Sequence, residues 1–182
     1  MNNSTRTQQK NLPQLLDDIN NVDFPSDPTQ IADMGYEFVE MGMYKEAYQF
    51  FCYGITIDDT DPDLLNGLGI TLCELGELDK SRIILDRSLR IDSSNPITLA
   101  NIAGVCWEQE LYDQCVYYYN RSLEYGPDIE ETHLNLINCY LEMGLLYMAF
   151  LVCAEFLKLF PGHEEGEELR DDIILNLGIS LY

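Results

Sequence analysis

The feature that most constrains this chain is a spacing of 34 residues between helix-start signals. Asp27-Pro28, Asp61-Pro62 and Asn95-Pro96 each place an Asx residue directly before a proline. Asp and Asn side chains cap helix N-termini, and proline is tolerated at the first helical position because that N–H has no partner within the helix. The same interval reaches Glu130, which lacks the proline. The sequence therefore predicts four consecutive frames: 28–61, 62–95, 96–129 and 130–163.

Small residues recur at fixed places within these frames, as expected of a true repeat. One stands at the centre of the first half, a glycine follows that half, and another small residue opens the second half. Apolar residues on both sides of the glycine follow helical spacing. Each frame therefore predicts two antiparallel helices joined by a tight turn, with small residues where the helix axes approach. The recurring residues are Gly35, Gly69 and Ala103 at the centre, Gly42, Gly76 and Gly144 at the turn, and Ala47, Ser81, Cys115 and Ala149 at the second opening.

The segment before the first frame, residues 1–27, is polar apart from one short amphipathic stripe. Four apolar residues there fall at i, i+3, i+4 and i+7, which predicts a short helix with one apolar face. This face has to bury against something, and two partners are considered: the first repeat, or a second copy of the chain in a homodimer. The stripe consists of Leu12, Leu15, Leu16 and Ile19.

The segment after the last frame, residues 164–182, does not fit a fifth frame by its sequence. It still carries an amphipathic stripe of Leu169, Ile173, Ile174 and Leu177. The last repeat of a stacked array has no neighbour, so its apolar face needs a cover. We therefore predict that this segment is a C-terminal capping helix.

The composition excludes several classes of partner. The chain has 32 acidic and 10 basic residues, a net charge of −22, which repels nucleic acid and anionic membranes. No apolar run approaches the ~20 residues that span a bilayer, and the N-terminus lacks a signal-peptide core. The six cysteines form no CxxC pair, so they are interpreted as buried, reduced side chains. These features predict a cytoplasmic protein without membrane insertion.

No catalytic or cofactor-binding motif is found in the sequence. The two histidines, His133 and His163, accompany no nucleophile motif. Residues 58–63 are rich in carboxylates, but Pro62 stands where an EF-hand loop needs a turn glycine. We therefore expect no catalytic residues, no metal site, no cofactor and no enzyme activity.

The order of positions over Pro28–His163 resembles the tetratricopeptide repeat (TPR) family. This resemblance implies an all-α fold, a right-handed superhelical solenoid of about four helix-turn-helix repeats. Ile137 and Phe156 depart from the family pattern because they stand at positions that are normally small. His133 also departs from it, since a large apolar residue is usual there. All three departures lie in the fourth frame.

The resemblance also implies a binding site. In TPR proteins the first helix of each repeat lines a concave groove, which here would be mainly apolar with a few amides. Such a lining suits an extended peptide whose backbone is satisfied by Asn66 and Asn138. Trp107 is expected to be a binding hot spot, or else a core tryptophan. The implied groove residues are Tyr36, Val39, Asn66, Ile70, Cys73, Ala100, Gly104, Trp107, Leu134, Asn138 and Leu141.

One acidic position recurs at the 34-residue interval near the end of each first helix. It could form an acidic rail along the groove that attracts a basic partner, or simply a solvated position before the turn. The four predicted first helices contain no lysine or arginine. Because TPR proteins that grip the carboxylate tails of heat-shock chaperones use basic groove residues, such a partner is not expected. The acidic rail consists of Glu40, Glu74, Glu108 and Glu142.

Within the TPR family, the stretch from GYEFVEMGMYKEAYQFF through DPDLLNGLGI resembles the opening of class II chaperones of type III secretion. The resemblance implies a cytoplasmic chaperone that holds a secreted, translocator-like client through an extended segment in the groove. Those chaperones usually have three repeats, whereas this chain has four predicted frames. The alternative considered is a TPR adaptor that scaffolds a multiprotein assembly without chaperone activity.

Overall fold

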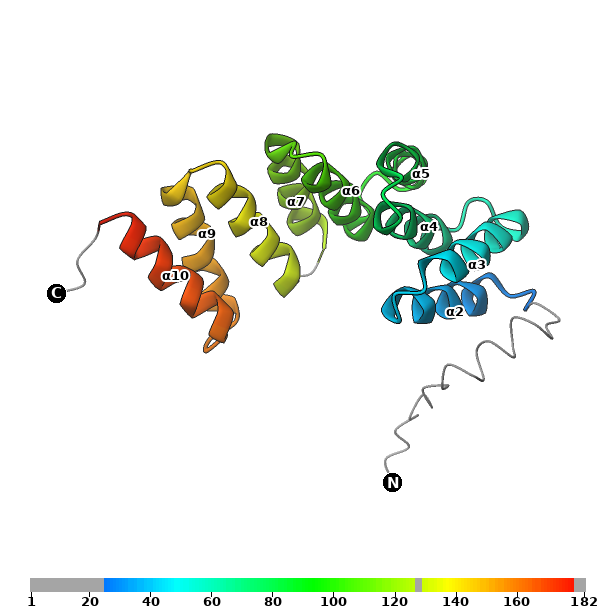
Figure 1. The fold of residues 1–182 in the computed structure, drawn as a ribbon, viewed down its shortest axis with the longest axis horizontal. Coiled ribbons are helices and arrows are strands. Elements are labelled where there is room, and N and C mark those ends of the chain that lie inside the picture. Colours follow the sequence, from blue (N-terminus) through cyan, green and yellow to red (C-terminus); the bar gives the residue numbers. More distant parts are fainter. Residues whose placement is uncertain (1–24, 127–128, 179–182) are drawn as a thin grey trace, which may run out of the picture.

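The computed structural model describes residues 25–126 and 129–178, which form nine α-helices and no strand. The predicted N-terminal stripe of Leu12, Leu15, Leu16 and Ile19 lies outside the described residues. Helices of 13 and 14 residues alternate up to α9. The helices, labelled as in Figure 1, are α2 (Pro28–Glu40), α3 (Tyr44–Ile57), α4 (Pro62–Glu74), α5 (Leu78–Ile91), α6 (Pro96–Glu108), α7 (Tyr112–Tyr125), α8 (Glu130–Glu142), α9 (Leu146–Leu159) and α10 (Glu164–Asn176).

The helices pack in the order in which they occur in the chain. Each first helix packs on its own second helix, and that second helix packs on the first helix of the next pair. Figure 1 shows the pairs following one another along an arc from α2 to α10. The predicted all-α, TPR-like superhelix is therefore confirmed.

The predicted Asx caps start three of the first helices. The Asp61 carboxylate accepts hydrogen bonds from the backbone N–H groups of Asp63, at 2.8 Å, and Leu64, at 3.0 Å. Asn95 caps α6 and Asp27 caps α2 in the same way. The fourth first helix begins after Ile129, which makes no side-chain cap. The repeat therefore persists there without a cap, because packing contributes most of the stability of a protein helix.

The turns between the two helices of a pair need one residue with a left-handed backbone. Gly42, Gly76 and Gly144 occupy this position with φ between 69° and 76°. Glu110 occupies it in the third repeat, with φ 58°. A residue with a Cβ is disfavoured there by roughly 1–2 kcal/mol. The geometry of the turn is thus imposed by the packing of α6 and α7 and not by the local sequence.

The period does not stop at residue 164, contrary to the prediction from sequence. Helix α10 starts at Glu164, which is 34 residues after Glu130, and has the 13 residues of every first helix. Gly178, with φ 68°, continues the turn position. The repeat is hard to recognise in the sequence because Glu167 and Asp171 replace the apolar and small residues at those positions of earlier first helices.

These substitutions make α10 a cap. Ile31 and Gly35 of α2 are buried, whereas their counterparts in α10, Glu167 and Asp171, are exposed. On its other face α10 still buries Ile173 in the core formed by the last two repeats. The helix therefore keeps the face that covers repeat four and presents a polar face where a second helix would otherwise pack.

The interfaces between repeats pair a position of one second helix with a position of the next first helix. At the first interface the pair is Gly54 with Leu64, and a Cβ on Gly54 would lie 2.5 Å from a Leu64 methyl carbon. At the second the pair is Ser88 with Thr98, whose hydroxyls lie 2.9 Å apart.

At the last interface the sizes are reversed. Phe156 is fully buried, and a Cβ on Gly166 would lie 2.6 Å from its ring. His133 and Phe160 surround the same ring, with centroids 5.9 Å and 4.9 Å away. The large residue at 156 is thus accommodated because its partner at 166 has no side chain, so the departures at His133 and Phe156 belong to one packing solution.

We predict that Phe156→Ser destabilises the protein by about 3–5 kcal/mol, because it empties a filled interface. The double variant F156S/G166T restores the Ser–Thr pair of the second interface and should recover at least about 1 kcal/mol of this loss. Denaturant unfolding of the wild type, both single variants and the double variant measures the coupling. Additive effects of the two substitutions would show that the positions do not share one space.

Candidate functional site

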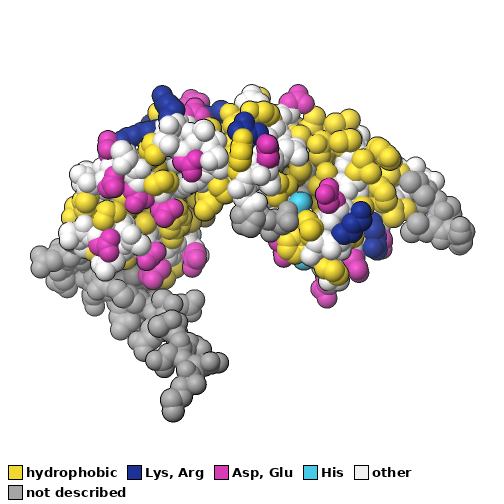
Figure 2. Space-filling view, turned by 180° about the vertical axis from the view of Figure 1, so that it is seen from behind, with side chains coloured by type: hydrophobic (Ala, Val, Ile, Leu, Met, Phe, Trp, Pro, Cys, Tyr) yellow, Lys and Arg dark blue, Asp and Glu magenta, His cyan; other side chains and the backbone are white. Residues whose placement is uncertain are grey.

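The first helices α2, α4, α6 and α8 follow one another on the inner side of the arc. Figure 2 shows the molecule as an arch with a hollowed underside. Within these four helices there is no lysine or arginine. All predicted groove residues except Asn66 keep part of their surface accessible, although their contact with a ligand stays a prediction: Tyr36, Val39, Ile70, Cys73, Ala100, Gly104, Trp107, Leu134, Asn138 and Leu141.

Asn66 does not face the groove, which corrects the prediction that its amide satisfies a peptide backbone. Its exposed fraction is 0%, and its side-chain oxygen accepts a hydrogen bond of 2.9 Å from the Thr98 hydroxyl. The Thr98 hydroxyl also lies 2.9 Å from that of Ser88. This buried polar chain joins α4, α5 and α6, so Asn66 holds repeats together.

A cavity of about 390 Å³ lies where α4, α6 and α8 meet on the inner side. We call it the Gly104 hollow. Five predicted site residues line it: Ile70, Cys73, Glu74, Ala100 and Gly104. Sequence reasoning missed four further lining residues, which are Ile97, Asn101, Glu131 and Asn135.

The missed residues had a signal in the sequence. Asn101 and Asn135 are 34 residues apart, and so are Ile97 and Glu131. Each pair therefore repeats one position of the first helix, on the side next to the predicted groove positions. The lining of the Gly104 hollow combines apolar side chains with two amides and two carboxylates, and it includes no lysine or arginine.

The absence of a side chain at Gly104 is what keeps this hollow open. A Cβ at this position would meet no atom within 4 Å, and the backbone is not left-handed. By contrast, a Cβ on Gly69, in the middle of α4, would lie 2.4 Å from a Leu85 methyl carbon. Glycine inside a helix costs roughly 0.5–1 kcal/mol relative to alanine. Neither packing nor backbone geometry in the described structure requires that cost at Gly104.

The aromatic residues of the groove lie outside the hollow. Trp107 is half-buried and packs edge-on against Tyr112, with ring centroids 5.4 Å apart. It thus combines core contact with an accessible surface. Tyr36 donates a hydrogen bond of 3.1 Å to the backbone oxygen of Asp63. Burial, together with the nearby charges of Asp63 and Asp61, raises the pKa of the Tyr36 hydroxyl, so this donor stays protonated.

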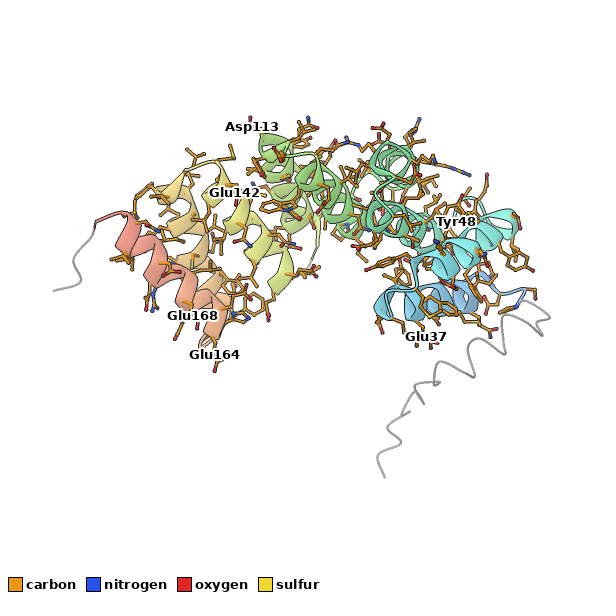
Figure 3. All side chains as sticks on the ribbon, viewed as in Figure 1. Glu37, Tyr48, Asp113, Glu142, Glu164 and Glu168 are labelled. Carbon is orange, nitrogen blue, oxygen red and sulfur yellow. The ribbon has the colours of Figure 1, made fainter. Side chains whose placement is uncertain are left out.

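The four glutamates of the acidic rail are all exposed, and each ends a first helix. The Tyr44 hydroxyl hydrogen-bonds to Glu74, which ties the rail to the preceding repeat. Glu142 lies at the end of α8, near Asp113 at the start of α7 (Figure 3). Negative charge at a helix C-terminus opposes the helix dipole, so the rail gains nothing from its location.

The rail also affects a groove cysteine. Burial, followed by the charges of Glu108 and Glu74, raises the pKa of the Cys73 thiol to about 11. The thiol is therefore protonated and unreactive near neutral pH. Within the described part of the chain, no group of three His, Cys, Asp or Glu residues is arranged to hold a metal ion. Over the same residues, no helix combines the length and the apolar character needed to cross a bilayer.

We predict that Gly104→Ala raises the free energy of unfolding by roughly 0.5–1 kcal/mol, because it removes the cost of glycine and fills empty space. Gly69→Ala is the matched control and should destabilise the protein, since its Cβ would collide with Leu85. Chemical denaturation of both variants measures the two signs. A destabilised G104A would mean that the fold, and not the hollow, needs this glycine.

We also predict that Glu108→Gln lowers the pKa of Cys73, because it removes a nearby negative charge that disfavours the thiolate. Iodoacetamide should then modify Cys73 faster at a given alkaline pH. The rate can be followed site by site with peptide mass mapping. Glu142→Gln removes the same charge at the other end of the rail and should leave the profile unchanged; equal profiles for E108Q and the wild type would contradict the assignment.

Comparison with known proteins is consistent with this geometry. No protein-family model matches the chain. The TPR repeat-containing protein YsoA of Bacillus subtilis is 29% identical over 69 residues. The match covers 38% of this chain and 21% of YsoA, so the chain spans about a fifth of that relative's length.

Three solved structures share the fold. The APC/C hetero-tetramer Cut9–Hcn1 has a TM-score of 0.74 and 17% identity, over 83% of this chain and 30% of that chain. A tetratricopeptide repeat protein from Parabacteroides merdae has a TM-score of 0.69 and 14% identity, over 91% and 65%. YrrB, described as a TPR protein with an unusual peptide-binding site, has a TM-score of 0.64 and 15% identity, over 90% and 84%. Such identities establish the fold alone, and the chain accordingly folds as a TPR array.

Proposed function

We propose that this protein binds an extended segment of another protein in its concave groove. The observation that carries the proposal is the Gly104 hollow, which is open at the meeting point of α4, α6 and α8. The chain keeps a helical glycine there although its described neighbours leave room for a side chain. A stability cost without a structural reason is typical of a position that is kept for a ligand.

The lining fits a peptide better than a small metabolite or a nucleic acid. Apolar surface from Ile70, Ala100 and Ile97 can bury side chains, while Asn101 and Asn135 offer amide groups to a backbone. An extended peptide leaves its own N–H and C=O groups unpaired, so it needs such partners. The net charge of −22 and the acidic rail favour a basic segment and disfavour an anionic one.

A finer form of the proposal is that the occupant belongs to a secreted, translocator-like client and that the protein is its chaperone. The sequence resemblance near GYEFVEMGMYKEAYQFF supports this form, and an acidic, groove-bearing helical array suits it. The relatives described above carry no name that mentions secretion. The chaperone role therefore rests on the sequence resemblance.

An adaptor role is the second candidate, and the outer surface favours it. The second helices expose apolar residues there, including Ile83, with an exposed fraction of 63%, and Tyr147, with 65%. Leu151, one turn from Tyr147 on α9, is also exposed. Figure 2 shows apolar side chains spread over the outer face as well as the underside. A scaffold would use both faces at once, whereas a chaperone needs only the groove.

Affinity capture from the native host separates the two candidates. One secreted protein bound in stoichiometric amount would support the chaperone. Several cytoplasmic proteins that stay bound when Tyr147→Ser leaves the groove intact, or leave when that variant is used, would respectively place the contacts elsewhere or on the outer face of α9.

We predict that Ile70→Asp abolishes capture of groove ligands without unfolding the protein. Ile70 is partly exposed, so an aspartate there puts a charge into the groove without burying it in the core. Leu72→Asp is the matched control: Leu72 has an exposed fraction of 5%, and a buried charge should unfold the chain. Circular dichroism reports the fold and capture reports binding. If folded I70D retains its ligands, the groove is not the binding site.

A further inference from the structure

The Gly104 hollow has two carboxylates at its edge and no cation to balance them. Glu74 comes from α4 and Glu131 from α8, and both line the cavity. Both are exposed, and neither forms an ion pair with any residue that the structure describes. From this arrangement, and given the proposed function, we infer that the hollow receives a lysine or arginine side chain of the bound segment.

The walls of the hollow match the two parts of such a side chain. Ile70 and Ala100 provide apolar surface beside the open position at Gly104, where an aliphatic stem can lie. Lysine and arginine bury their methylene stems against apolar surface while the charged head stays near water. The carboxylates of Glu74 and Glu131 then accept charge-assisted hydrogen bonds from the head.

The backbone of the same ligand residue has a partner in Asn101. The side-chain nitrogen of Asn101 is buried and has no hydrogen-bond partner among the described residues. An unsatisfied buried donor destabilises the free protein and gains an interaction when an acceptor arrives. A peptide carbonyl supplies that acceptor, whereas a carboxylate would be repelled by Glu74 and Glu131.

Other side chains fit the hollow less well. An acidic side chain meets two like charges, and a purely apolar one leaves both carboxylates without a partner while it approaches them. The carboxylates therefore act as a selection against acidic segments as well as an attraction for basic ones. This specificity differs from the general effect of the acidic rail, because only Glu74 belongs to both sets.

A random peptide library displayed on phage tests the inference on the full chain. We expect the selected peptides to share one lysine or arginine at a fixed place between apolar residues. A selected peptide is then synthesised with a fluorophore, together with a variant that has glutamine at the basic position. Fluorescence anisotropy measures the affinity of both peptides for the wild type and for E74Q/E131Q.

We expect E74Q/E131Q to bind the basic peptide about tenfold more weakly, the scale of one hydrogen bond to a charged group, and to lose the preference over the glutamine peptide. E155Q/E168Q removes the same charge from α9 and α10 and should bind as the wild type does. Gly104→Leu fills the hollow and should also weaken binding, with a melting curve to show that it folds.

Three results decide the matter. A fixed basic residue whose advantage disappears in E74Q/E131Q supports the inference. Peptides without a basic position, or an unchanged preference in E74Q/E131Q, overturn it; the proposed function survives that result if I70D still loses the peptides. Selected peptides that I70D binds as tightly as the wild type, or a selection that enriches none, overturn both.

Discussion

The structure depends on the way neighbouring helices share a fixed space. At each interface between repeats, one side chain from a second helix and one from the next first helix fill the same volume. Gly54 with Leu64 and Phe156 with Gly166 are opposite solutions, while Ser88 with Thr98 is an intermediate one joined by a hydrogen bond. Because interiors are close-packed, a change at one position is tolerated only when its partner compensates for it. The arc, and therefore the groove, follows from this succession of filled interfaces.

The Gly104 hollow is the exception to that rule. Elsewhere a missing side chain is matched by a large neighbour, as Gly69 is by Leu85 and Gly166 by Phe156. At Gly104 no described neighbour enters the space, and carboxylate and amide groups gather around it instead. The contrast separates the two uses of glycine in this chain: one permits close packing, and the other leaves a surface concave. It also links packing to function, because a groove needs both rigid walls and an unfilled floor.

Most of the fold could be predicted from the sequence, because the 34-residue interval fixes where helices start and turn. The prediction was wrong at α10, where Glu167 and Asp171 hide the period although the helix keeps its register. The site was harder to predict. Family positions indicate which face of a helix points inwards, but not whether a neighbour covers the residue, and Asn66 is covered through its hydrogen bond to Thr98. Asn101 and Glu131 became visible only when three helices were placed together in space.

The central claim is that a ligand segment lies across α4, α6 and α8. The most direct measurement is an NMR titration of the isotope-labelled protein with the segment that it captures. The account predicts that the largest amide and side-chain shift changes occur at Ile70, Asn101 and Gly104, with the Asn101 side-chain NH₂ moving as it gains an acceptor. Changes confined to the outer face, at Ile83, Tyr117 and Tyr147, with the groove signals unmoved, would contradict it.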